Sequence, residues 1–279
     1  LMHTKNVLLV SGCPRSGTSW VHFLISAHPD TVTVRETHLY DKYIGPLKSW
    51  FDKEEQFKGA DGLSAIFSER DFLNNVLAPI VHTSFSKIAA LADNQHTIIE
   101  KTPGNLLYHR LIREIQPDAR LLVVIRDPRA VYSSFKAGSS QNWGGWMKKS
   151  VSEFCSSWNK YAAAYIAARS YWPEDRLKLV KYEDMKNSGE HELSNIYSWA
   201  DLTEVEGLVG KALRENKIEK LKQTKKGSLQ HESRIDFYRS GKAYGWVEEL
   251  SFAEIKEIEE HCADLMFLLG YKVHRRKRE

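Results

Sequence analysis

The sequence has little cysteine and no long apolar run. Its three cysteines, Cys13, Cys155 and Cys262, are not spaced as metal-binding pairs, and three are too few for a disulfide framework. This usage indicates a reducing compartment. No stretch approaches the roughly 20 apolar residues that a membrane helix needs. A strand pattern begins as early as Val7, which leaves no room for a signal peptide, so we expect a cytoplasmic protein without a membrane partner.

A strong excess of charge of either sign is also missing. The chain has 40 Lys and Arg against 36 Asp and Glu, a net charge of +4 and a pI near 8.8. A mildly basic protein suits an anionic cofactor or substrate but falls short of a dedicated nucleic-acid binder. The 42% hydrophobic and 27% charged residues are typical of a globular protein with one large core. We expect no nucleic-acid partner.

Strand patterns alternate with helical patterns along the chain. Apolar segments that predict strands lie at 7–10, 31–34, 97–100, 120–125 and 177–181. This alternation predicts a parallel sheet with helices on both faces. Neither a repeat nor a long linker divides the sequence, so we expect one α/β domain over residues 1–279. Irregular helices at 45–95 and a Gly/Ser-rich mobile loop at 137–147 are expected to surround the site.

The last helical pattern has clear start and stop signals. Ser251 and Glu254 have the spacing of a capping box, and Gly270 follows the apolar stripe as a stop. A long helix is also predicted over residues 151–171. Both helices would cover the sheet.

A glycine-rich turn follows the first apolar run. Gly12 and Gly17 are spaced like the two glycines of an ATP-binding phosphate loop, but Thr18 stands where that loop has its lysine. The positive charge comes earlier, at Arg15. Backbone N–H groups and the following helix N-terminus would still hold a phosphate. The turn therefore predicts an anionic nucleotide other than magnesium ATP.

Charged or hydroxyl-bearing segments follow four of the predicted strands. In open α/β sheets, ligands bind beyond the carboxyl ends of the strands. The segments are residues 15–18, 100–102, 126 onward and 182–183. Their convergence predicts a P-loop-like central sheet with one site at this edge.

Two of these segments resemble motifs of the sulfotransferases that use 3′-phosphoadenosine 5′-phosphosulfate (PAPS). Residues 14–20 read Pro-Arg-Ser-Gly-Thr-Ser-Trp and are similar to the loop that holds the 5′-phosphosulfate. Residues 126–134 resemble the 3′-phosphate motif, an arginine followed eight residues later by a serine. Residues 237–242, with Trp246, resemble a C-terminal loop that closes over the same phosphate, although the usual Arg-Lys-Gly reads Arg-Ser-Gly here. The resemblance spans nearly the whole chain.

The resemblance implies PAPS as the donor, 3′-phosphoadenosine 5′-phosphate (PAP) as the product, and no metal. Trp20 matches the residue whose ring stacks on adenine, and Tyr182 lies in a Tyr-Glu-Asp sequence that resembles another nucleotide contact. The implied nucleotide-binding residues are Arg15, Ser16, Gly17, Thr18, Ser19, Trp20, Arg126, Ser134, Tyr182, Arg239, Ser240 and Gly241.

The acceptor side resembles one branch of the family. Cytosolic sulfotransferases of phenols and steroids usually have Lys-Thr-His, with the histidine as base, whereas this chain has Pro103 in the place of that histidine. The sequence Glu-Lys-Thr-Pro at 100–103 is similar to heparan-sulfate sulfotransferases instead. So is Arg-Glu-Thr-His-Leu-Tyr-Asp at 35–41, which resembles a segment whose glutamate is the base.

This resemblance implies four catalytic residues. Glu36 is the candidate base and His38 is its partner or stands in for it. Lys101 would stabilise the transferring sulfuryl oxygens, and Arg15 would hold the leaving 5′-phosphate. Asp41 is taken as structural.

The sequence therefore predicts in-line transfer of a sulfuryl group from PAPS to a hydroxyl or amine of a small natural-product acceptor, because sulfuryl transfer resembles phosphoryl transfer. A glycan sulfotransferase and a non-catalytic binder of anionic glycans or nucleotides are alternatives. A P-loop kinase or NTPase is a further one, although the loop lysine and a magnesium-binding aspartate at a strand end are both missing.

Overall fold

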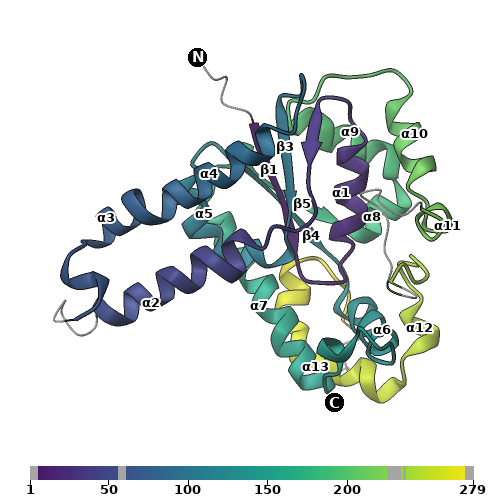
Figure 1. The fold of residues 1–279 in the computed structure, drawn as a ribbon. Helices are drawn as coiled ribbons and strands as arrows, with labels where there is room; N and C mark the ends of the chain where they lie inside the picture. Colours follow the sequence, from purple (N-terminus) through teal and green to yellow (C-terminus); the bar gives the residue numbers. More distant parts are fainter. Residues whose placement is uncertain (1–5, 56–60, 225–233, 235–236, 274–279) are drawn as a thin grey trace.

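Five parallel strands form the centre of the protein, in the order β2-β3-β1-β4-β5 (Figure 1). The computed structural model describes residues 6–55, 61–224, 234 and 237–273. Every residue of β3 and β4 is buried, as expected for strands covered on both faces. The strands are β1 (Asn6–Gly12), β2 (Thr31–Thr33), β3 (Thr97–Lys101), β4 (Arg120–Ile125) and β5 (Leu177–Lys181). All five predicted strands are confirmed.

Helices connect the strands and cover both faces of the sheet. In the described residues the α-helices are α1 (Thr18–Ser26), α2 (Gly45–Glu55), α3 (Glu69–Phe72), α4 (Ala78–Ala89), α5 (His109–Ile115), α6 (Pro128–Ser139), α7 (Val151–Arg169), α8 (Tyr182–Asn187), α9 (Gly189–Trp199), α10 (Leu208–Glu215), α11 (Ile218–Leu221), α12 (Trp246–Glu249) and α13 (Phe252–Leu268). Shorter 3₁₀ or π turns are η1 (Leu39–Ile44), η2 (Leu63–Ala65), η3 (Leu73–Leu77), η4 (Pro103–Tyr108), η5 (Gly145–Met147) and η6 (Glu174–Arg176). Within the described ranges, no helix is long and apolar enough to cross a membrane.

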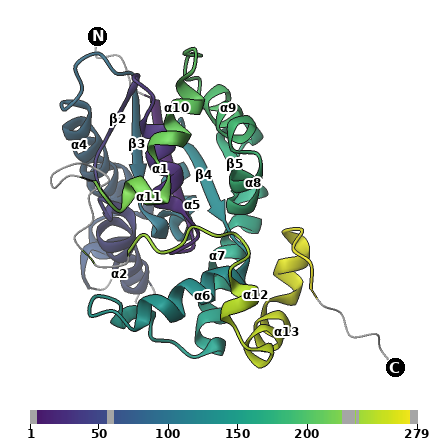
Figure 2. The same ribbon diagram turned by 90° about the vertical axis from the view of Figure 1, so that its right-hand side faces the viewer.

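Two apolar layers hold the helices against the sheet. On one face, Leu8 and Val10 of β1 pack with the buried sides of α1, α8, α9 and α10, which lie in front of the sheet in Figure 2. On the other face, Leu9 packs with α4, α5, α6, α7 and α13. Since successive strand residues point to opposite faces, β1 contributes to both layers. This arrangement confirms the predicted α/β fold.

Local capping determines where the long helices begin. The predicted box at α13 is present, with the Ser251 hydroxyl accepting from the Glu254 backbone N–H and the Glu254 carboxylate accepting in return. Gly270 follows α13 with a φ of 75°, which only glycine adopts easily. Ser150 and Glu153 form a second capping box at the start of α7.

Between β2 and β3, helices α2, α3 and α4 extend away from the sheet as an arm (Figure 1). Its core includes Phe51 stacked on Phe72, with ring centroids 4.2 Å apart. The irregular helices expected at 45–95 are therefore present. The loop expected at 137–147 begins later than predicted, because α6 continues to Ser139. Met147 packs directly against the backbone of Gly138 in this helix. A Cβ at position 138 would lie 2.2 Å from the Met147 Cε, so a larger residue would force Met147 to move.

A buried ion cluster joins α6 to α13. Arg129 is 4% exposed, donates to both carboxylate oxygens of Asp127 and bonds Glu259 of α13. Its guanidinium also lies over the Trp246 ring, 4.2 Å from the centroid. Removing one partner from a buried ion pair leaves an uncompensated charge, which is more costly than never having had the pair.

Replacing Arg129 by methionine should lower the free energy of unfolding by about 3–5 kcal/mol, because two buried carboxylates would lose their cation. Lys136→Met is the matched control on the same helix: Lys136 is half exposed and pairs with Glu254 near the surface, so that substitution should change the free energy by only about 0–1 kcal/mol. Urea denaturation measures both. Equal losses would show that the buried cluster has no special role in stability.

Candidate functional site

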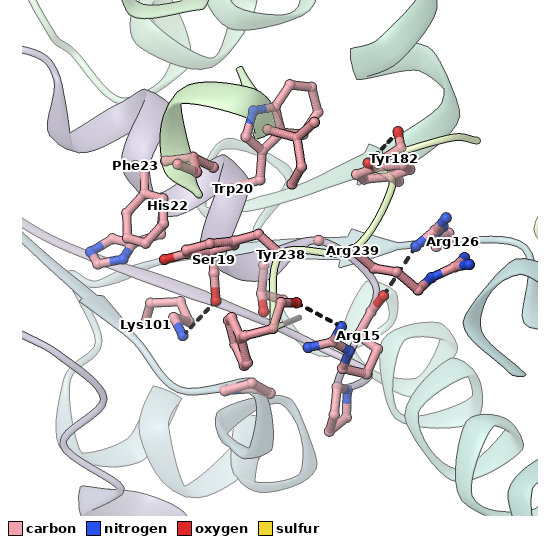
Figure 3. Close-up of a pocket in the computed structure, with 18 of the residues that line it drawn as sticks. Arg15, Ser19, Trp20, His22, Phe23, Lys101, Arg126, Tyr182, Tyr238 and Arg239 are labelled. Carbon is pink, nitrogen blue, oxygen red and sulfur yellow. Dashed lines mark hydrogen bonds between the residues drawn. The ribbon is translucent and has the colours of Figure 1, made fainter. Parts of the chain in front are cut away.

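The carboxyl ends of the strands surround a cavity of about 1110 Å³ (Figure 3). The parallel register sets this arrangement: Val10 pairs with Lys101 of β3, and Gly12 pairs with Val124 of β4. The loop after β1 therefore begins between Lys101 on one side and Arg126 on the other. The four segments that the sequence places at strand ends all contribute to the cavity lining.

The loop after β1 turns through three positive φ angles. Gly12 has a φ of 144°, and a Cβ there would lie 2.1 Å from the Val124 carbonyl oxygen. Gly17 has a φ of 97° and caps the start of α1, with Tyr182 so close that a Cβ would meet its ring at 2.4 Å. Arg15 has a φ of 69°, which is uncommon for a residue with a side chain. This turn directs the N-terminus of α1 toward the cavity.

Arg15 joins the loop to α6 and to the C-terminal segment. Its Nε donates to Ser134 Oγ at 3.1 Å, and its Nη2 donates to the Phe237 carbonyl at 3.0 Å. The guanidinium lies 4.9 Å from the Phe237 ring centroid. The side chain thus contacts Ser134, the serine of the segment that resembles a 3′-phosphate motif.

Arg126 is a buried cation at the end of β4. It is 7% exposed, donates to the carbonyls of Arg15 at 3.4 Å and Lys242 at 2.7 Å, and lies 4.4 Å from the Tyr182 ring centroid. Burial lowers the pKa of its guanidinium, while the negative charge of Glu183 acts in the opposite direction. Its Nε has no hydrogen-bond partner among the described residues. A buried donor of this kind is available to an anion.

The segment around Gly241 closes this end of the cavity. The Tyr182 hydroxyl donates to the Gly241 carbonyl at 2.9 Å. Arg239 donates to Glu249 at 2.7 Å and to Ser133 at 3.3 Å. The buried hydroxyl of Ser240 has no partner within the described ranges. Two unsatisfied polar groups, the hydroxyl of Ser240 and the Nε of Arg126, therefore belong to the same end of the site.

Trp20 forms an aromatic wall farther along α1. Its indole N–H donates to the Asn216 carbonyl at 3.0 Å, and its ring meets Tyr182 edge-on at 5.5 Å. The Lys186 ammonium lies 5.0 Å from the Trp20 ring centroid. A flat ring could stack here, since Trp20 lines the cavity and is not fully buried.

On the opposite side from Arg126, four ionisable side chains form a row. Lys101 is 6% exposed and bonds both Ser19 Oγ, at 3.1 Å, and Glu36 Oε1. Glu36 Oε2 lies 3.2 Å from His38 Nε2, and His38 Nδ1 lies 3.1 Å from Asp41 Oδ2. Glu36 is therefore held between the lysine and the histidine, with 35% of its side chain exposed.

The buried carboxylate of Glu100 holds the loop that carries this row. It accepts hydrogen bonds from the Thr37 backbone and hydroxyl at 3.1 and 2.8 Å, from Thr102 at 2.6 Å and from Asn105 at 2.7 Å. Thr102 in turn accepts from the His38 backbone N–H at 3.2 Å. Such bonds allow His38 to keep a φ of 53°.

Comparison with known proteins decides the family. Residues 8–206, more than two-thirds of the chain, match the sequence profile described as the sulfotransferase family. The chain belongs to the sulfotransferase family. The enzyme is therefore a transferase, and its phosphate-loop fold is that of its family.

Relatives of this sulfotransferase are distant in sequence. A protein named as a protein-tyrosine sulfotransferase in Caenorhabditis briggsae is 23% identical over 72% of the chain and 68% of its own length. The chain spans only 33% to 42% of three other relatives, which are named as protein-tyrosine and carbohydrate sulfotransferases.

Solved structures share the fold. The sulfotransferase domain of the Synechococcus PCC 7002 olefin synthase has a TM-score of 0.61 at 17% identity, covering 98% of this chain and 98% of that domain. The mouse sulfotransferase SULT7A1 complexed with PAP has a TM-score of 0.60 at 12% identity, covering 94% of this chain and 85% of that one. At such identities the likeness concerns the fold.

The structure of the sulfotransferase brings most of the predicted site residues to one cavity. Ser16 and Ser134 are almost fully buried and are not among the lining residues. The predicted residues that line the cavity are Arg15, Gly17, Thr18, Ser19, Trp20, Glu36, His38, Lys101, Arg126, Tyr182, Arg239, Ser240 and Gly241.

Sequence reasoning missed several side chains of this site, including four that carry ionisable groups. Asp41 was assigned to structure alone, yet it bonds His38. Glu100 was noted only as part of a motif, and its position in a fully buried strand was the signal that its charge must be satisfied. His22 and Lys186 carry no signal in the sequence, because only the packing of α1 and α8 places them beside the cavity.

Glu100→Gln should destabilise the enzyme by about 1–3 kcal/mol, because the new amide N–H₂ would replace one carboxylate oxygen and face either the Thr37 and Thr102 donors or the Asn105 donor, which would leave buried groups unpaired. The substitution should also raise hydrogen-exchange rates at residues 36–38. Glu114→Gln is the control, since Glu114 is exposed and lies at the surface, 3.5 Å from the Tyr171 hydroxyl. Unchanged exchange in the Glu100 variant would show that this carboxylate does not hold the loop.

Proposed function

We propose that this sulfotransferase transfers a sulfuryl group from PAPS to a hydroxyl or amine of a small-molecule acceptor. The observation that carries the proposal is the row from Lys101 through Glu36 and His38 to Asp41, which begins at Ser19 of the phosphate loop. A cation beside the loop and a carboxylate beside that cation are what in-line transfer to a protonated acceptor needs.

The other side of the cavity fits the nucleotide. A bisphosphorylated adenosine needs cations at two points and a flat surface for its base. Arg15 and Arg126 supply the cations, the buried donors on Arg126 and Ser240 have no partner in the described chain, and Trp20 supplies the surface. Bound PAPS would supply the sulfuryl group and a phosphate leaving group. These residues would then bind the nucleotide through its phosphates without help from a metal.

The row of charges favours Glu36 as the base. His38 lies between two carboxylates, with Nε2 facing Glu36 and Nδ1 facing Asp41. Glu36 lies next to Lys101 in the row, and its carboxylate can take the acceptor's proton. His38 and Asp41 orient Glu36, and Lys101 stabilises negative charge on the sulfuryl group during transfer.

The size of the cavity supports a small acceptor. At about 1110 Å³ it exceeds the usual volume of a pocket for one drug-sized ligand, so a nucleotide and a compact second molecule can be held together. Macromolecular acceptors, as the names of the relatives suggest for those proteins, are the alternative outcome. The cytoplasmic location remains a prediction from cysteine usage.

Glu36→Gln should lower kcat by about 10²–10⁴-fold, because the amide cannot accept a proton. The affinity for PAP, measured by calorimetry, should stay near that of the wild type. Turnover is measured as transfer of ³⁵S from labelled PAPS to a phenol or sugar panel. A variant with wild-type turnover would remove Glu36 from the mechanism.

Arg126→Ala should weaken PAP binding by roughly 1.5–3 kcal/mol, the usual loss for a hydrogen bond to a charged group. Adenosine 5′-phosphate, which lacks the 3′-phosphate, should lose much less. Arg110→Ala is the control, since Arg110 lies on α5 against Tyr171 and does not line the cavity. Equal losses for both nucleotides in calorimetry would reject Arg126 as the 3′-phosphate ligand.

A further inference from the structure

His22 is a cavity residue with no part in the chemistry proposed above. It lies on α1 three residues after Ser19, and it lines the cavity although only 1% of it is exposed. Figure 3 shows its ring next to Phe23, on the Lys101 side of the cavity and away from Arg126. His22 is therefore placed near the group-transfer end of the site.

The hydrogen bonds of Thr33 determine which nitrogen of His22 carries the proton. The Thr33 hydroxyl has one hydrogen, and its carbonyl partners are Ile99 at 2.8 Å and Val34 at 3.2 Å. With two carbonyls in reach of that hydrogen, we assign Thr33 Oγ1 as the acceptor in its 2.6 Å contact with His22 Nε2. Nε2 therefore carries the hydrogen, and Nδ1 of the neutral ring has the lone pair.

The ring stays neutral over the working range of pH. Burial, followed by the positive charge of Lys101, lowers the pKa of His22 to about 3. Nδ1 can then accept a hydrogen bond but cannot donate one. It has no partner among the described residues, and a buried polar atom without a partner is unfavourable.

We propose that His22 Nδ1 accepts a hydrogen bond from a second O–H or N–H of the acceptor, adjacent to the group that receives the sulfuryl. This inference rests on the proposed function and narrows its acceptor class. A vicinal diol or an amino alcohol has the required pair of donors. A molecule with a lone hydroxyl does not, and a carboxylate or sulfate is disfavoured because it would bring a second lone pair to Nδ1.

The neighbouring side chains suit a ring-shaped carbon skeleton. Phe23 and Tyr238 meet edge-on, with centroids 6.4 Å apart, and both line the cavity beside His22. Such aromatic walls pack against a flat or cyclic skeleton, while one polar atom sets its orientation. His22 would thus be a specificity-determining residue.

Two conservative variants separate the two nitrogens of the ring. In asparagine, the side-chain oxygen is two bonds from Cβ, as Nδ1 is in histidine. In glutamine, the amide reaches the distance of Nε2 instead. His22→Asn therefore keeps an acceptor at the Nδ1 position, whereas His22→Gln keeps a partner for Thr33 and loses that acceptor.

The kinetic test uses catechol and its monomethyl ether, 2-methoxyphenol, with ³⁵S-labelled PAPS. After division by two for the equivalent hydroxyls of catechol, the wild type should prefer catechol in kcat/KM by about fivefold to tenfold, the effect of one hydrogen bond. His22→Asn should retain the preference, and His22→Gln should lose it. The same ratio in all three proteins would overturn the proposal.

A binding test does not depend on turnover. In the PAP-saturated enzyme with ¹⁵N-labelled histidine, the two ring signals of His22 are those absent from His22→Gln, and Nδ1 is the one of the two at the position of an unprotonated nitrogen. Catechol should move that signal toward the position of a protonated nitrogen, and 1,2-dimethoxybenzene, which has no donor, should not. No difference between the two ligands would overturn the proposal. A shift with catechol but no labelled product from either phenol or from the wider phenol and sugar panel would instead count against the proposed acceptor reaction, while the His22 contact stands.

Discussion

The close approach of β1 and β4 at Gly12 is the constraint on which the site depends. Any side chain at this position would collide with the Val124 carbonyl, so the two strands can run side by side to their ends only because glycine stands there. The loop that follows is thereby inserted between Lys101 and Arg126. One missing Cβ thus fixes the positions of two cations from different strands relative to the same helix N-terminus.

The two sides of the cavity use charge differently. Arg126 is buried against the Tyr182 ring and donates hydrogen bonds to two main-chain carbonyls. No carboxylate is hydrogen-bonded to its guanidinium among the described residues, so the guanidinium remains available to an anion. Lys101 instead bonds Glu36 directly, and that carboxylate continues to His38. A buried ammonium is tolerated there because its partner neutralises it. The first arrangement suits binding, whereas the second suits movement of a proton.

Sequence patterns predicted the sheet well, because residues 7–10 and 121–125 are apolar runs of strand length, and the other three segments are short stretches rich in β-branched or alternating apolar residues. They also predicted the loop, since the glycine spacing around Arg15 is specific. The contacts within the site could not be predicted in the same way. The bond from Arg15 to Ser134 joins residues 119 positions apart, and the orphan nitrogen of His22 in α1 depends on the hydroxyl of Thr33 in β2. Such contacts follow from packing, which no local pattern encodes.

The C-terminal segment at residues 237–242 is held against the cavity by hydrogen bonds to its backbone carbonyls. Tyr182 and Arg126 hold it by the carbonyl oxygens of Gly241 and Lys242, and Arg15 holds the carbonyl of Phe237. Every residue type offers the same carbonyl, so these three attachments do not depend on the side chains of Phe237, Gly241 and Lys242. A serine can therefore replace the lysine usual at position 240 without loosening the closure.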